Sequence, residues 1–80
     1  MLPLLFDWDA GNVDHVARHG IAPEEVEDAL LDPQRIGADV CRPLGEARWA
    51  YLGSTDAGRV LFVVTTRRRR RVRVVTAREA

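Results

Sequence analysis

The stretch RVLFVVTTRRRRRVRVVTAR, residues 59–78, decides the fold class of this 80-residue chain. It holds two apolar segments, residues 59–67 and 71–77, joined through a run of five arginines. The first is apolar on both faces, as a central strand is, and in the second valine and arginine alternate, which puts Val72, Val74 and Thr76 on one face. The two segments therefore predict a β-hairpin with Arg68, Arg69 and Arg70 in its turn, and not a basic tail.

Further strands are expected before this hairpin. ARWAYLG, residues 47–53, alternates in the β manner, and STDAG, residues 54–58, is typical of a turn. A weaker strand is expected between Arg35 and Pro43. These segments together predict an antiparallel sheet of three or four strands.

The first half of the chain predicts two helices. The first follows the lead-in FDWD, with Asp9 suited to the N-cap and Gly20 to the C′ position, and one side holds Val13, Val16 and Ala17. The second lies in APEEVEDALLDP, residues 22–33, where Pro23 fits the first helical position and one face holds Val26, Ala29 and Leu30. We therefore expect a single α+β domain over residues 1–80, with two N-terminal helices packed on the sheet.

The composition is that of an ordinary globular domain. The chain is 46% hydrophobic and 30% charged, and it has no apolar run long enough to span a membrane. The start, MLPLLFDWD, lacks the basic region of a signal peptide. The single cysteine, Cys41, excludes an internal disulfide, so the cytoplasm is the expected compartment.

The net charge of zero conceals a strong asymmetry. Residues 1–40 carry nine carboxylates against two arginines, a net −7, whereas residues 41–80 carry ten arginines against three carboxylates, a net +7. One interpretation is a molecule with an acidic and a basic surface, the latter suited to phosphates. The other is that the two halves attract each other within the fold.

Histidines supply the first candidate chemistry. Asn12, His15 and His19 are spaced i, i+3, i+7 and so form one stripe on the first helix. Three interpretations are open: a metal pair without a clear third ligand, hydrogen bonding within the fold, or an imidazole for acid–base catalysis near neutral pH. The pattern alone does not separate them.

Arginines within the expected strands supply the second candidate chemistry. Arg48 lies beside Trp49, and Arg71 and Arg73 share one face of the last strand. Such residues most often face solvent, but guanidinium groups that converge bind phosphate and stabilise the charge of a phosphoryl-transfer transition state. The aromatic residues are either core packing or platforms for unpaired RNA bases; they are Trp8, Trp49 and Tyr51.

Several common catalytic motifs are missing from the sequence. It has no Gly-rich phosphate loop, no Ser or Cys nucleophile signature and no CxxC pair. An enzyme built from this chain is expected to work without a metal or an organic cofactor. Histidine and arginine then suit cleavage of RNA through its own 2′-hydroxyl.

A set of motifs spread along the chain points to a known family. They are the F-x-W-D opening (residues 6–9), a helix that ends in His-Gly (19–20), an E-x-R-W strand (46–49), a G-R-x-L-x-V-V strand (58–64) and a closing R-V-V-T-A-R (73–78). In combination they resemble the BrnT family of bacterial toxins, from Phe6 to Arg78. The chain departs from the family at positions 68–70, where relatives commonly have a small glycine-containing turn and this chain has three arginines.

The resemblance implies a RelE-like ribonuclease fold and a toxin that cleaves RNA without a metal and so inhibits translation. It also implies a cognate antitoxin, and operator DNA bound only through the toxin–antitoxin complex. By matching motif positions, the resemblance assigns functional roles to His19, Arg48, Arg73 and Arg78.

The leading hypothesis is therefore the toxin of a type II toxin–antitoxin pair. His19 or His15 would transfer protons, and Arg48 and Arg73 would hold the scissile phosphate. The expected substrate-binding residues are Arg67, Arg71, Arg78, Trp8, Asn12 and Tyr51. The alternative is a non-catalytic, nucleic-acid-binding subunit of a heterodimer that contributes only a basic sheet surface.

Overall fold

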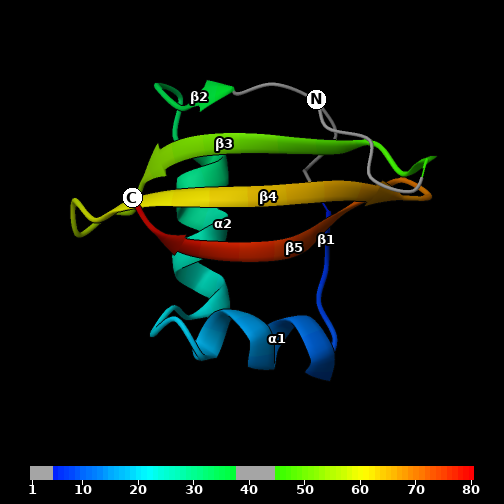
Figure 1. Ribbon diagram of the computed structural model, residues 1–80. Helices are drawn as coiled ribbons and strands as arrows, with labels where there is room; N and C mark the ends of the chain where they lie inside the picture. Colours follow the sequence, from blue (N-terminus) through cyan, green and yellow to red (C-terminus); the bar gives the residue numbers. More distant parts are fainter. Residues whose placement is uncertain (1–4, 38–44) are drawn as a thin grey trace.

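The computed structural model describes residues 5–37 and 45–80, which form two helices and a five-stranded sheet (Figure 1). The elements in chain order are β1 (Phe6–Asp7), α1 (Ala10–Ala17), α2 (Pro23–Leu31), β2 (Ile36–Gly37), β3 (Arg48–Ser54), β4 (Val60–Arg68) and β5 (Arg71–Glu79). The strand order is β1-β5-β4-β3-β2, so β4 is central. Helix α2 covers one face of the sheet and α1 lies along β5 (Figure 1). No helix in residues 5–37 and 45–80 covers the other face, here called the open face.

The α+β class is confirmed, but the expectation of three or four antiparallel strands is wrong. The sheet has five strands and is mixed, because β1 runs parallel to β5, with Phe6 opposite Val72 and Asp7 opposite Arg73. Two paired residues are too few to produce an alternating pattern, so the sequence showed only a lead-in. Of the weaker strand expected at 35–43, Ile36–Gly37 is present as β2, and residues 38–43 lie outside the described part of the chain.

The hairpin expected from the opening stretch is confirmed, but Arg68, which was expected in its turn, is the last residue of β4. Strands β4 and β5 pair up to Arg68 opposite Arg71, which leaves a two-residue turn at Arg69 and Arg70. Arg69 takes a φ of 60°, in the left-handed region where glycine is the usual residue.

One irregularity changes which residues of β5 share a face. The pairing shifts between Val64, which lies opposite Thr76, and Thr65, which lies opposite Val74. Val75 is therefore an extra residue, a β-bulge, and the alternation moves by one position beyond it. The prediction that Thr76 shares a face with Val74 is wrong: Ala77 is buried there instead.

Local hydrogen bonds fix both ends of α1 as the sequence predicts. Asp9 is the N-cap, since its carboxylate accepts from the Asn12 backbone N–H and its own N–H donates to Asn12 Oδ1. At the other end Gly20 has a φ of 72°, and Ile21 N–H donates to the Val16 carbonyl as in a Schellman motif. The expected apolar side is only partly correct: Val16 is buried, but Val13 and Ala17 are exposed, and Asn12 is the other buried residue.

Helix α2 packs against the core through the face that the spacing of its apolar residues predicts. The residues that it buries are Val26, Ala29 and Leu30, and they pack with Val16, Ile21, Leu61, Val63, Val74 and Ala77. The helix can approach this closely because β3 presents Gly53: a Cβ there would lie 2.0 Å from the Ala29 carbonyl oxygen. The absence of a side chain at one position of β3 therefore sets the helix–sheet distance.

We expect Gly53→Ala to destabilise the fold, because the added methyl group forces α2 away from the sheet. The free energy of unfolding should fall by about 1–3 kcal/mol, the usual cost of overpacking, and the melting temperature by about 4 °C or more. Gly37→Ala is the matched control, since the nearest described atom that a Cβ there would meet is Cε1 of Tyr51, at an ordinary contact distance of 3.8 Å. Equal melting temperatures for the two variants would contradict this account of the packing.

Candidate functional site

The open face of the sheet carries a row of polar residues across its strands. Arg48 of β3 lies opposite Thr66 of β4, Thr66 lies opposite Arg73 of β5, and Arg73 lies opposite Asp7 of β1. Residues directly opposite each other share a face, and adjacent strands are about 4.8 Å apart. The row therefore sets two guanidinium-bearing residues on one surface, with their backbones about 10 Å apart.

Helix α1 forms a wall beside this row and supplies a histidine. The His15 Nε2 atom lies 3.0 Å from the Thr76 hydroxyl oxygen on β5, within hydrogen-bond distance. The wall and the sheet enclose an open cleft of about 280 Å³. Its polar lining residues are Asn12, His15, Glu46, Arg48, Thr66, Arg68 and Arg73.

Asn12 fixes the wall to the sheet. Its side chain, only 5% exposed, donates from Nδ2 to the carbonyl of Asp7 in β1 (2.9 Å) and to that of Val74 in β5 (3.1 Å). Its Oδ1 accepts from the Asp9 N–H at the start of α1. Every hydrogen-bonding atom of the amide side chain except one lone pair is thus occupied, so Asn12 positions the site and has little left to offer a ligand.

Arg73 is the most deeply placed cation of the cleft. Its side chain is 18% exposed, and its Nη1 lies 2.9 Å from the Asp9 carboxylate and 3.6 Å from that of Asp7. The Asp9 carboxylate raises the pKa of Arg73, while the Arg73 guanidinium, together with the Asn12 N–H, lowers the pKa of Asp9. Nη1 is buried, and its ion pairs with Asp9 and Asp7 hold it in place.

The other two arginines of the cleft, Arg48 and Arg68, are more exposed than Arg73 and less constrained by ion pairs. Arg48 is 36% exposed, and among the described residues its one ion pair is through Nε, which donates to Glu46 at 3.1 Å. Arg68 is exposed, and no carboxylate within residues 5–37 and 45–80 lies within 4 Å of it. These two side chains can turn toward an anion in the cleft without breaking a buried contact.

The two histidines are neighbours but not equivalent. Their ring centroids are 5.8 Å apart, so the stripe expected from the sequence exists. His15 lines the cleft and contacts Thr76, whereas His19 lies beyond the end of α1 and does not line it. Among the residues that the structure describes, no three His, Cys, Asp or Glu side chains gather as a metal site requires.

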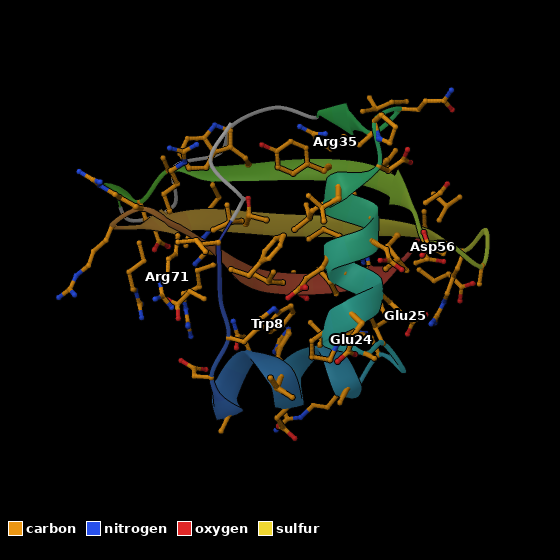
Figure 2. The ribbon with its side chains drawn as sticks, turned by 180° about the vertical axis from the view of Figure 1, so that it is seen from behind. Trp8, Glu24, Glu25, Arg35, Asp56 and Arg71 are labelled. Atoms are coloured by element: carbon orange, nitrogen blue, oxygen red, sulfur yellow. The ribbon has the colours of Figure 1, made fainter. Side chains whose placement is uncertain are left out.

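The remaining candidates are spread over both faces of the sheet. Trp8 donates from Nε1 to Glu27 at 2.8 Å and packs against the core, and Figure 2 shows it beside α2 on the helix side. Tyr51 and Arg67 line a different pocket, of about 330 Å³, which also includes Trp49. The structure therefore does not bring these side chains together with His15.

Two further arginines lie on the open face outside the cleft. Arg78 is opposite Phe62, and its guanidinium lies 5.5 Å from the centre of that ring. Arg71 lines a hollow next to the cleft with Asp7, Arg68 and Arg69. Sequence reasoning overlooked Arg68 and Thr66 as cleft residues, and Thr76 as the contact of His15. Arg68 looked like part of a solvated turn, and the other two depend on the strand pairing and the bulge.

Comparison with protein families decides the class of the molecule. Residues 8–80 match the family model described as the ribonuclease toxin, BrnT, of type II toxin–antitoxin systems. The chain belongs to the BrnT family. The resemblance expected from the F-x-W-D, E-x-R-W and R-V-V-T-A-R motifs is therefore confirmed, and the family is one of ribonuclease toxins.

Other comparisons with this BrnT-family chain add little. None of the curated proteins compared with it matches. Within the described ranges, 5–37 and 45–80, no helix has the length and apolar character needed to cross a membrane.

The ion pair between Asp9 and Arg73 makes the stability of this BrnT-family chain depend on pH. Because the pKa of Asp9 is lowered in the folded state, its contribution is present at neutral pH and is lost as the pH falls through that lowered value. We expect the free energy of unfolding to drop below about pH 4, and less steeply in Asp9→Asn, which keeps a good N-cap but no charge. Urea unfolding of both proteins from pH 7 to pH 3 measures this, and parallel pH profiles would contradict it.

Proposed function

We propose that this protein is a metal-independent endoribonuclease that cleaves RNA at the cleft on the open face of the sheet. One observation carries the proposal: His15, Arg48, Arg68 and Arg73 line the same cleft. An imidazole can transfer a proton near neutral pH, and guanidinium groups bind phosphate with two parallel hydrogen bonds. These are the groups that cleavage through a 2′-hydroxyl requires.

The reaction proceeds by attack of the 2′-oxygen on the adjacent phosphorus. The bond between phosphorus and the 5′-oxygen breaks, which leaves a 2′,3′-cyclic phosphate and a 5′-hydroxyl. His15 takes the proton from the 2′-hydroxyl, its ring held by the contact with Thr76, and the leaving 5′-oxygen takes a proton from water. Arg48 and Arg68 bind the non-bridging oxygens and stabilise their growing negative charge, and Arg73 supplies a fixed positive charge at the floor of the cleft.

Residues along the same face bind the flanking nucleotides. Arg78 lies over Phe62, about 13 Å along β4 from Thr66 at the usual rise per residue. Unpaired bases stack on aromatic rings and on guanidinium planes, so this pair suits a neighbouring base. Arg71 lies beside the other end of the cleft and suits the phosphate backbone.

A cognate antitoxin is the expected protein partner, because the family operates in type II toxin–antitoxin systems. The open face and its arginines offer an acidic antitoxin segment a complementary surface. In this proposal the toxin inhibits translation in the cytoplasm, and the toxin–antitoxin complex represses its own operon by binding operator DNA through the antitoxin.

A second function is favoured by one observation. Arg73 is already neutralised by Asp7 and Asp9, which weakens its pull on a transition state. A non-catalytic subunit with a basic, nucleic-acid-binding sheet would tolerate such neutralisation. That protein would bind RNA or DNA in a salt-sensitive way and cleave neither.

We expect the purified protein, free of antitoxin, to cleave single-stranded RNA in EDTA. His15→Ala should slow cleavage by about 10²-fold or more, the lower range for loss of a general base, and Arg48→Ala by about 10²–10³-fold, the effect of one electrostatic contact. The measurement is the single-turnover rate of a labelled oligonucleotide.

His19→Ala and Arg35→Ala are the matched controls. His19 is a histidine at the end of the same helix outside the cleft, and Arg35 contacts Tyr51 away from the cleft. Both should retain a rate within a few-fold of the unchanged protein. A wild-type protein that binds RNA without cleaving it, or a fully active Arg48→Ala variant, would refute the catalytic proposal and favour the binding subunit.

A further inference from the structure

The turn between β4 and β5 is built from four consecutive arginines, Arg68 to Arg71, here called the arginine turn. Two-residue hairpins need a left-handed residue, and glycine meets this need without strain. Here Arg69 occupies it with a φ of 60°. A bulky side chain in that region costs free energy that glycine would avoid, so the turn is not optimised for stability.

The charges of the arginine turn have no partners within the described chain. All four side chains are exposed, and no carboxylate in residues 5–37 or 45–80 lies within 4 Å of any of them. By contrast, Arg59 contacts two carboxylates, Glu25 and Glu79. Adjacent guanidinium groups repel one another, so an anion from outside the protein would relieve both their repulsion and their exposure.

The arginine turn is continuous with the cleft. Arg68 lines the cleft, and it also lines the neighbouring hollow of about 310 Å³ together with Asp7, Arg69 and Arg71. Among the described residues that line this hollow, Asp7 is the one carboxylate; it lies 3.6 Å from Nη1 of Arg73 and is partly neutralised there. A chain of phosphates that leaves the cleft past Arg68 therefore meets Arg69 and Arg71 next. Figure 2 shows Arg71 at one end of the sheet and Asp56 at the far end.

We infer that Arg69, Arg70 and Arg71, the residues of the arginine turn beyond the cleft, form a separate RNA-backbone site, which binds phosphates flanking the scissile bond and takes no part in the chemistry. The inference rests on the proposed function for the position of the scissile phosphate. Single-stranded RNA is the ligand, because its evenly spaced phosphates match a row of exposed guanidinium groups that begins inside the cleft. In this inference the unfavourable backbone conformation of Arg69 is offset by the phosphate contact that its side chain makes at the tip of the hairpin.

Arg69→Gly separates stability from binding. The variant should melt about 4 °C higher, because glycine removes the left-handed strain, yet bind RNA about tenfold more weakly at low salt, because one charge-assisted contact is lost. The plot of log affinity against log salt for a single-stranded RNA with 2′-O-methyl groups, which cannot be cleaved through the 2′-oxygen, should become shallower by about 0.7 per lost phosphate contact.

Two further variants complete the test. Arg70→Ala removes a charge of the turn without touching the left-handed position, and it should also flatten the salt dependence. Arg35→Ala removes one charge beside Tyr51, outside the turn, and should leave that dependence unchanged. At saturating RNA the Arg69→Gly protein should cleave at the wild-type rate, with only KM increased.

Unchanged affinity and salt dependence in both Arg69→Gly and Arg70→Ala would overturn the inference. So would a reduced maximal cleavage rate with an unchanged KM, since that would place Arg69 in the chemistry. Failure of the proposed function looks different: the wild-type protein would bind the 2′-O-methyl RNA but leave ordinary RNA intact, while the arginine turn would still control the salt dependence.

Discussion

The buried amide of Asn12 holds the two parts of this molecule together. It bonds the carbonyls of Asp7 and Val74 and the N–H of Asp9, and so joins β1, β5 and the first turn of α1 at one point. A buried polar group left without its partners costs about 1–3 kcal/mol, so this geometry is strongly preferred. Because α1 is fixed here, His15 lies one turn further along against Thr76, beside the arginines of the open face.

Charge pairing across the two halves of the chain explains which arginines remain for ligands. Within residues 5–37 and 45–80 the acidic first half and the basic second half form ion pairs at two sites, where Arg73 meets Asp7 and Asp9 and where Arg59 meets Glu25. Both readings of the charge split therefore hold in part. Arg73 and Arg59 stabilise the fold through these ion pairs. The exposed arginines of the hairpin remain able to attract phosphate.

Local signals were the part of this fold that the sequence could predict. The β4–β5 hairpin, the buried face of α2 and both ends of α1 depend on spacing and on single capping residues, which are visible without knowing the tertiary structure. Strand β1 could not be predicted, because two residues carry no periodicity and their partner lies 66 residues away in sequence. The bulge at Val75 could not be predicted either, and it decides that Thr76 lies on the open face.

The sequence predicted the types of residue in the candidate site, but not the full set of residues that line it or their contacts. His15, Asn12, Arg48 and Arg73 were singled out by residue type and spacing, and they do line one cleft. The burial of Asn12 and the partners of Arg73 follow from contacts between distant segments. Tyr51 was expected in the same site as Arg48, as a substrate-binding residue, but the alternation along β3 places the two side chains on opposite faces of the sheet. The face of Tyr51 is the one that α2 covers.

Mapping a bound RNA on the protein tests the central claim most directly. The measurement is an NMR titration with a short single-stranded RNA that carries 2′-O-methyl groups, followed through backbone amides and the histidine rings. The account predicts the largest shifts at the open-face cleft, at Arg48, Thr66, Arg73 and the His15 ring, with little change at Trp49 and Tyr51. Shifts centred on the pocket of Trp49 and Tyr51, with the cleft unchanged, would contradict it.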